Sequence, residues 1–308
     1  MLPDNPPLRN LIKTGIDGPY MKGLIQISDE FIPERLSIYI VPGFLSENID
    51  KSHGTHEVDP DNFDDTWAEK SGADRWYRNG LNISEICDAN VFLVNWASKT
   101  RFKCLMDVFH DIAGIVFKYL VSLVGVNVVS RIFIFFISSF FKKVRIKTID
   151  NWRDAVKETD SVSCELADIC RESIGPNLII GHSLGGRIGY KVMEKLDCKN
   201  TAFISLAAAV SEKELSINAN HAFLIENFFS VYDTILAVLY RLGQGDKDYA
   251  VGNKKFSRNS IGIKEHNVSS DFRKKRNHWH YASDLEFFLS KSNLFHQAVM
   301  MSEASDEI

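Results

Sequence analysis

The stretch NLIIGHSLGGRIGY, residues 177–190, decides which fold this sequence predicts. It opens with an apolar run at 177–181 that reads as a buried strand, and a segment of helical period follows at 186–197. Between them stands GHSLG at 181–185, a pattern in which a strand turns sharply into a helix and holds the serine in a strained conformation. Side chains at the two flanking glycines would collide with the neighbouring strand or helix. The pattern therefore predicts Ser183 as a nucleophile, and an ordinary structural turn is the alternative.

Four more apolar runs of strand length lie along the chain, bounded by polar residues or turn formers. They are LSIYIV at 36–41, VFLVNW at 91–96, AFISL at 202–206 and AFLIENFF at 222–229. Segments of helical period, such as 152–172, lie between them. Strands that alternate with helices predict an α/β fold, in which a mostly parallel sheet is flanked by helices on both faces.

Length and composition limit the class of protein. The chain has 308 residues, a formal charge of −4 at pH 7 and 45% hydrophobic residues, which suits one large domain with a sizeable core. The mild acidity argues against a nucleic-acid partner, which would require clustered Lys and Arg. We expect an irregular lead-in over 1–22, a single domain over 23–301 and a disordered acidic tail over 302–308.

Cysteine usage and the start of the chain indicate the compartment. The cysteine count is five, which is odd, and no two of them form a CxxC pair, so neither a disulfide framework nor a zinc cluster is expected. The start MLPDNPPLRN lacks the charged and apolar regions of a signal peptide. We therefore expect a reducing, cytoplasmic setting, with membrane association left open by the apolar segment described next.

An apolar insertion over 104–143 interrupts the alternation of strands and helices. Its core, 104–141, ends in RIFIFFISSFF, and its most apolar window contains Asn127 and Arg131. A charge near the centre of a membrane span is costly, which makes a true span the least favoured of three readings. A helical cap over the site and a helix lying in a membrane surface are the other two, and each would bring apolar surface close to Ser183.

A serine nucleophile needs a base and an acid that orients the base, and in this fold they follow it in the order acid, then histidine. The acid should come directly after a later strand, and Asp233 follows the run at 222–229. The alternative role for Asp233 is the N-cap of the next helix, and both roles are compatible. Glu226 within the strand, and Asp246 and Asp248 on a polar loop, are weaker candidates.

The base should lie on a loop before the last helix, which we expect over 283–295. The run NHWHY at 277–281 fits and offers both His278 and His280, between which spacing alone does not decide. His266 and His221 are less suitable, because one lies in an earlier polar stretch and the other precedes a strand.

The reaction also needs two backbone amides directed at the developing oxyanion. One should belong to Leu184, which follows the nucleophile, and the other to Phe44, in the turn Pro42-Gly43-Phe44 after the strand at 36–41. An ordinary turn at the end of a strand is the alternative reading of that tripeptide. No metal or organic cofactor is expected, since His53 and His56 match no zinc-binding pattern and read as polar surface.

These motifs resemble the α/β-hydrolase superfamily, and within it the domain-of-unknown-function family of the transmembrane and coiled-coil domain-containing proteins. The resemblance covers about 36–285, in VPGFLSE at 41–47, VFLVNWAS at 91–98, NWRDAV at 151–156, SCELADIC at 163–170, GHSLGGRI at 181–188, NFFSVYDTILAVLYR at 227–241 and NHWHY at 277–281. It implies His278 as the base, because the offset from Tyr281 is the same. The chain differs from that family at Asn277, where glycine is usual, and at His280, where aspartate is usual.

The sequence thus predicts a serine hydrolase that cleaves a carboxylic ester through Ser183, His278 and Asp233 and an acyl-enzyme. The apolar insertion and 21 phenylalanines favour a lipid or phospholipid acyl ester and contact with a membrane surface through 104–143. The alternatives are a thioesterase or amidase, and a catalytically silent α/β-hydrolase that acts as a membrane-associated interaction module.

Overall fold

The computed structural model of the chain describes residues 21–43, 72–96, 129–196, 200–216, 224–233, 236–237, 240–241, 249–256, 263–272, 278 and 280–305. At 21–22, 72–74, 129–149, 151, 272 and 301–305 it describes the backbone alone. The predictions for the lead-in up to residue 20, for 104–128 of the apolar insertion and for 306–308 of the tail lie outside these residues.

A seven-stranded sheet forms the centre of the molecule, with the order β1-β3-β2-β4-β5-β6-β7. Its strands are β1 (Met21–Gln26), β2 (Ser37–Val41), β3 (Asn90–Trp96), β4 (Asn177–His182), β5 (Thr201–Leu206), β6 (Ile225–Phe229) and β7 (Lys264–Asn267). Only the edge pair β1–β3 is antiparallel, and every other pair is parallel. The mostly parallel α/β architecture predicted from the sequence is therefore confirmed.

All five predicted strands are present, and the two unpredicted ones are the edges of the sheet. β7 reads KEHN, and no residue in it is buried. Strand prediction from apolar runs relies on burial, so an edge strand with water on one side gives no such signal. β1 contains Gly23 and an irregularity in its register with β3, which also breaks the apolar pattern.

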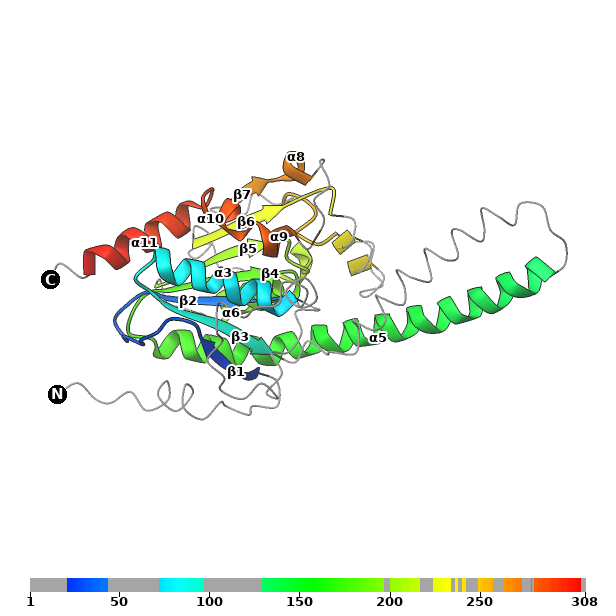
Figure 1. The fold of residues 1–308 in the computed structure, drawn as a ribbon, viewed down its shortest axis with the longest axis horizontal. Helices are drawn as coiled ribbons and strands as arrows, with labels where there is room; N and C mark the ends of the chain where they lie inside the picture. Colours follow the sequence, from blue (N-terminus) through cyan, green and yellow to red (C-terminus); the bar gives the residue numbers. More distant parts are fainter. Residues whose placement is uncertain are drawn as a thin grey trace, which may run out of the picture.

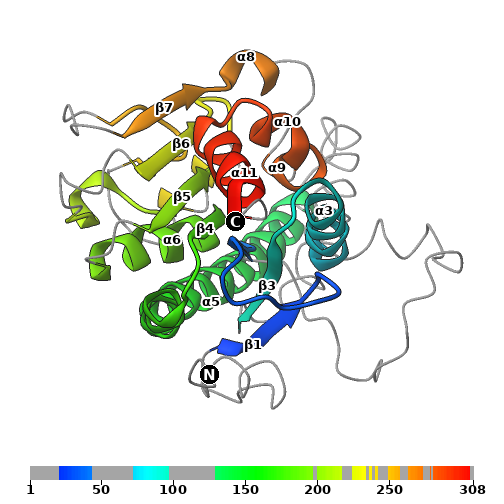
Figure 2. The ribbon, with the colours of Figure 1, turned by 90° about the vertical axis from the view of Figure 1, so that its left-hand side faces the viewer.

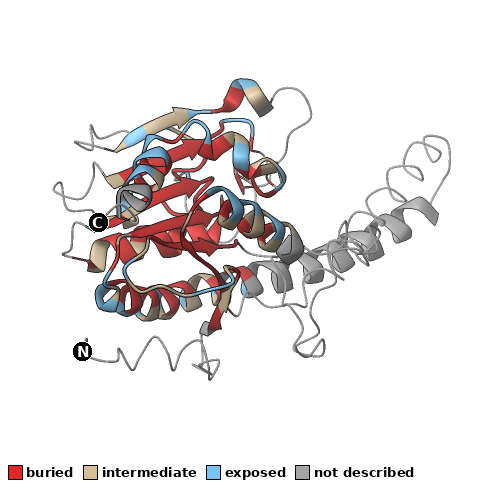
Figure 3. Cartoon of the chain, turned by 60° about the vertical axis from the view of Figure 1, so that its left-hand side comes forward, coloured by how far each residue is buried: buried red, intermediate tan, exposed pale blue. Residues whose placement is uncertain are grey.

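Helices cover both faces of the sheet (Figures 1 and 2). α5 (Val129–Glu172) and α6 (Leu184–Lys195) pack together on one face, with the short 3₁₀ turn Glu212–Glu214 beside α6. The other face carries α3 (Gly72–Ile86), α9 (His280–Ser283), α10 (Leu285–Leu289) and α11 (Asn293–Ser305), and α8 (Ser269–Phe272) follows the edge strand β7. Because both faces are covered, every described residue of β2, β4 and β6 is buried (Figure 3).

The predicted last helix over 283–295 is divided. α10 ends at Leu289, and α11 starts anew at Asn293, where the Ser292 hydroxyl accepts a hydrogen bond from the amide of Phe295 at 3.0 Å. That side-chain bond is an N-cap, so Ser292 marks the start of a new helix rather than a continuation of α10. α11 runs on to Ser305, so the residues 302–305 of the expected tail are helical.

The apolar insertion continues into α5. Residues 129–172 form one helix of 44 residues, whose N-terminal part extends beyond the sheet in Figure 1. Its later turns are anchored in the domain, where Trp152, Leu166 and Cys170 are buried. Within the described residues, none of the helices combines the length and the apolarity that a bilayer crossing requires.

The direction in which the chain crosses the sheet reverses between β2 and β4. β2 leads to β3 on one side through α3, whereas β4 leads to β5 on the other side through α6. In open α/β sheets, ligands bind beyond the carboxyl ends of the strands at this reversal. Gly43 follows the end of β2 and Ser183 follows the end of β4, so the predicted nucleophile lies where this rule expects a site.

Candidate active site

Ser183 has a strained backbone at the end of β4. Its φ of 54° and ψ of −118° lie in a region that L-residues rarely adopt, and only 2% of the residue is exposed. Such a conformation costs on the order of 1–3 kcal/mol, and it persists only where the surroundings impose it. Here the Ser183 amide donates to the carbonyl of Leu206 at 3.0 Å, and the Ser183 carbonyl accepts from the amide of Ala209 at 2.9 Å. The end of β5 thus holds the serine in place.

Three glycines around Ser183 allow backbone segments to approach each other closely. A Cβ added at Gly185 would lie 1.9 Å from the carbonyl oxygen of Val41, and one at Gly181 would lie 2.5 Å from that of Gly185. A Cβ at Gly43 would lie 2.6 Å from the Cβ of Ser183. Side chains at Gly181 and Gly185 would therefore collide with neighbouring backbone, as expected from the sequence. The turn after β2 passes directly beside the serine.

His278 and Asp233 form a buried pair. The Nδ1 atom of His278 lies 2.7 Å from Oδ2 of Asp233, and the two side chains are 4% and 0% exposed. The other carboxylate oxygen of Asp233 accepts a hydrogen bond from the amide of Leu236 at 3.0 Å. One oxygen of Asp233 therefore caps the following helix while the other contacts the imidazole, so the geometry is compatible with both roles considered for this residue.

The ring of His182 connects this pair to the nucleophile's strand. Its centroid lies 4.5 Å from that of His278, 5.6 Å from Tyr281 and 5.4 Å from Trp76. Burial, and next the charge of a protonated His278, hold the pKa of His182 well below its ordinary value. The neutral ring can donate from Nε2 to the carbonyl of His278, 3.2 Å away. His182, which directly precedes Ser183, is therefore in contact with both the backbone and the ring of His278.

The structure describes Leu184 and His280 among the other predicted site residues and leaves several more outside its described part. Leu184 is the first residue of α6 and is buried, so its amide lies at a helix N-terminus, which favours developing negative charge. His280 starts α9, two residues beyond the histidine that meets Asp233. Outside the described residues lie Phe44, His53, His56, His221, Asp246 and Asp248.

Glu226 and His266, both weaker candidates, belong to the edge of the sheet. Oε1 of Glu226 lies 3.3 Å from Nζ of Lys264 and 3.6 Å from Nε2 of His266, and it accepts from the amide of Asn293 at 3.1 Å. These contacts join β6, β7 and the start of α11, and the His266 ring stacks on Phe228. Neither residue has a contact with Ser183 or His278 among those described.

Sequence reasoning missed Trp96 as part of this site. Its indole Nε1 donates to the carbonyl of Pro42 at 2.9 Å, and its side chain is buried. The bond ties the end of β3 to the turn that passes beside Ser183. The available signal was position, because Trp96 ends a predicted parallel strand and the carboxyl ends of such strands meet at one edge.

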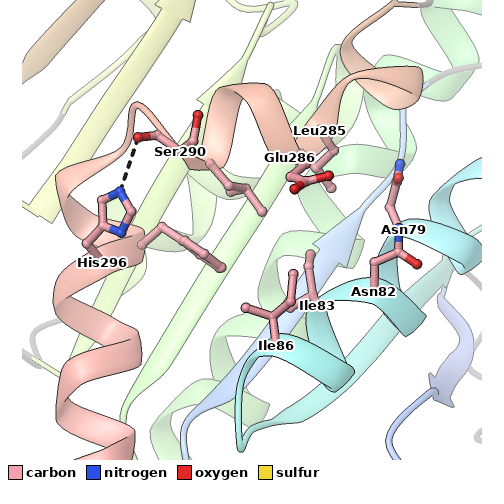
Figure 4. Close-up of a pocket in the computed structure, with 10 residues that line it drawn as sticks. Asn79, Asn82, Ile83, Ile86, Leu285, Glu286, Ser290 and His296 are labelled. Carbon is pink, nitrogen blue, oxygen red and sulfur yellow. Dashed lines mark hydrogen bonds between the residues drawn. The ribbon is translucent and has the colours of Figure 1, made fainter.

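A cavity of about 180 Å³ lies between α3 on one side and α10 and α11 on the other (Figure 4). Ile83, Ile86 and Leu285 contribute apolar walls, and Glu286 and His296 are among its polar residues. Trp76, near the start of α3, contacts the ring of His182, whereas the cavity is lined by the end of that helix. The lining begins at Asn79, only three residues or about 4.5 Å of helix after Trp76, but Ser183, His278 and Asp233 are not among the residues that line the cavity.

The described residues contain no group of three or more His, Cys, Asp or Glu side chains that could hold a metal ion. Comparison of the chain with models of protein families, with curated proteins and with solved structures returns no match.

Proposed function

We propose that the protein is a serine hydrolase of the α/β-hydrolase fold that cleaves a carboxylic ester through an acyl-enzyme. One observation carries the proposal, the buried pair of His278 and Asp233, with 2.7 Å between Nδ1 and Oδ2. The His278 ring contacts the ring of His182, and His182 directly precedes Ser183, whose backbone is strained. A serine, a histidine and a buried carboxylate in this chain order, at the carboxyl edge of a parallel sheet, are the parts that acyl transfer needs.

In the proposed reaction, Oγ of Ser183 attacks the ester carbonyl while Nε2 of His278 takes the hydroxyl proton. The carbonyl π electrons move onto its oxygen, and the amides of Leu184 and Phe44 bind that oxyanion. When the tetrahedral intermediate collapses, the bond to the leaving oxygen breaks, and His278 gives its proton to the departing alcohol. Water, deprotonated by the same ring, then attacks the acyl-enzyme, releases the carboxylic acid and restores Ser183.

Asp233 has two functions in this scheme. It accepts a hydrogen bond from the Nδ1–H group of His278, which leaves Nε2 as the basic nitrogen, and it stabilises the imidazolium that forms. Because its second oxygen is engaged by the amide of Leu236, the carboxylate has one orientation available. The base is therefore oriented before substrate binds.

The proposed substrate class is a lipid or phospholipid acyl ester. Its support is the strongly apolar composition of 104–143, which enters the chain between β3 and the body of α5, two elements of the site's own sheet and cover. A thioester or an amide would use the same residues, so the leaving atom is to be distinguished by experiment.

A fluorophosphonate probe tests the class, because it labels a serine only when the serine is activated as a nucleophile. We expect labelling of the wild type and of Ser37→Ala, a matched buried serine at the opposite edge of the sheet, and none of Ser183→Ala. Turnover on p-nitrophenyl butyrate should fall in Ser183→Ala by about 10⁴-fold or more. Absence of labelling in the folded wild type would favour a catalytically silent interaction module.

A further inference from the structure

Residues 250–253, here called the brace, lie against the end of β5. The amide of Val251 donates to the carbonyl of Val210 at 2.8 Å, and the amide of Gly252 donates to that of Ala208 at 3.1 Å. A Cβ at Gly252 would lie 2.3 Å from the carbonyl carbon of Ala207, so only glycine allows this approach. The brace is thus held on the backbone that follows β5.

The same backbone holds the nucleophile. Ala209 donates to the carbonyl of Ser183, and a Cβ at Gly186, one turn into α6, would lie 2.7 Å from the Cβ of Ala208. Ala207 has a φ of 49°, which a non-glycine residue adopts only when its surroundings require it. The segment from Ala207 to Ala209 therefore contacts the strand-to-helix turn at Ser183 on one side and the brace on the other.

The opposite side of the brace holds the turn that carries Asp233. The carbonyl of Gly252 accepts from the amide of Ser230 at 3.0 Å. Nδ2 of Asn253 donates to the carbonyl of Asp233 at 2.8 Å and to that of Ser230 at 3.3 Å, which are the two ends of the turn. Each carbonyl also accepts a backbone amide, Ser230 from Asp233 and Asp233 from Ala237, so the buried side chain of Asn253 is the second donor to both.

From this geometry we infer that Asn253 is a positioning residue, whose side-chain amide sets the Asp233 carboxylate against His278. The inference rests on the proposed function of the Ser183 site. The two hydrogen bonds of the Asn253 side chain go to backbone carbonyls of the turn, and Asn253 acts on Asp233 through that backbone. A primary amide is suited to this place because one NH₂ group can serve two carbonyls, whereas a carboxylate would face both with like charge.

Asn177 provides a matched control. It is also buried, at 2% exposed, and its Nδ2 donates to the carbonyl of Cys170 at 3.1 Å and to Oγ1 of Thr201 at 3.3 Å. In both asparagines Oδ1 has no hydrogen-bond partner within the part of the chain that the structure describes. Asn177 starts β4, at the opposite end of the strand from Ser183, so its replacement has a similar local cost without reaching the site.

The experiment compares Asn253→Asp with Asn177→Asp, and Asn253→Ala with Asn177→Ala as the pair that adds no charge. We expect both Asn253 variants to lose on the order of 10²-fold in kcat on p-nitrophenyl butyrate with KM little changed, because a displaced base costs rate rather than binding. The Asn177 variants should keep the wild-type kcat at matched melting temperatures.

A second measurement separates this inference from the proposed function. The proton between Nδ1 of His278 and Asp233 should give a far-downfield proton NMR signal, which we expect to shift or vanish in the Asn253 variants and to persist in the Asn177 variants. An unchanged signal and an unchanged kcat in Asn253→Ala would overturn the positioning role. A wild type without esterase activity or probe labelling, but with a signal that responds to Asn253, would overturn only the proposed function.

Discussion

At the residue scale, the site depends on side chains that serve two partners at once. Asp233 caps a helix with one oxygen and contacts His278 with the other. The His182 ring lies tilted against the imidazole of His278 and can also donate to the His278 carbonyl. A residue with two obligations has few conformations that satisfy both, which is how a site becomes fixed before its ligand arrives. Replacement of such a residue should therefore affect catalysis more than its single contacts suggest.

We predict that His278→Ala lowers kcat by about 10⁴-fold and that His280→Ala changes it by less than about 10-fold. The reason is that Asp233 meets His278, whereas His280 lies in the first turn of α9. Steady-state kinetics on p-nitrophenyl butyrate, with melting temperatures as the check on folding, provide the measurement. Equal losses in the two variants, or a larger one in His280→Ala, would reverse the assignment.

The sequence indicated the residues of the site to the extent that local pattern carries them. Ser183 has its signal in the six or so residues around it, and Asp233 follows a recognisable strand. The choice between His278 and His280 depends on which ring faces a carboxylate 45 positions earlier in the chain, and no local pattern encodes that contact. Asn253 gave no signal, because its two bonds to the turn join residues 20 and 23 positions apart in the chain.

At the scale of the elements, the carboxyl ends of neighbouring strands are bonded to each other. Trp96 at the end of β3 donates a hydrogen bond to the carbonyl of Pro42 after β2. Ser183, directly after β4, is hydrogen-bonded to Leu206 at the end of β5 and to Ala209 beyond it. The central strands were predictable because each is an uninterrupted apolar run. The bonds between their ends were not, because they join residues that are distant in sequence, such as Trp96 and Pro42.

We predict that Trp96→Phe lowers kcat about 10-fold and destabilises the fold by about 1–3 kcal/mol. The phenyl ring keeps most of the buried apolar surface but leaves the Pro42 carbonyl without its donor, in the turn proposed to supply an oxyanion amide. Urea unfolding and steady-state kinetics measure the two effects. Trp152→Phe, a buried tryptophan on α5, is the matched control, and a kcat loss of similar size in it would argue against a role for the turn.

The contact of β6 with β7 and α11 predicts a pH dependence of stability. Burial alone would raise the pKa of Glu226, but the neighbouring polar side chains of His266, Ser292 and Lys264 outweigh this and lower the pKa from 4.5 to about 2. A carboxyl whose pKa is lowered by folding stabilises the folded state at pH values above its pKa in the unfolded chain. That stabilisation is lost as the pH falls from about 4.5 towards 2.

Glu226→Gln should therefore be less stable than the wild type at pH 7, and the difference in unfolding free energy should shrink as the pH falls below about 4.5. Urea titrations at a series of pH values from 7 to about 3 measure it. Glu286→Gln, at the wall of the cavity between α3 and α10, serves as the control carboxylate. A difference that stays constant over this range would show that the Glu226 charge does not stabilise the fold.

At the scale of the whole molecule, Ser183, His278 and Asp233 do not line the cavity that lies between α3, α10 and α11. The Ser183 site lies at the reversal of the sheet, where parallel α/β proteins bind ligands. In the sequence, the apolar run at 104–128 follows the strand that ends at Trp96. Its composition is the support for the proposed lipid substrate.

We predict that the intact protein floats with phosphatidylcholine vesicles in a density gradient, and that a variant with 104–128 replaced by a short Gly/Ser linker does not. Burial of apolar side chains in the bilayer surface is worth about 25 cal/mol per Å², so a run of this composition can hold a domain of net charge −4 at a neutral membrane without electrostatic attraction. The replacement ends before Val129 and leaves α5 whole, so its packing on α6 is kept.

Activity on two substrates gives this variant its meaning. If 104–128 serves to reach lipid, the linker variant should retain turnover of p-nitrophenyl butyrate, which is delivered from water, and lose turnover of a vesicle-borne phospholipid. If the segment is instead a cap that shapes the site, both activities should change together, and neither protein should float. Flotation by both proteins would assign membrane contact to another surface and remove the main support for a lipid ester, because the case for that substrate depends on this segment's composition.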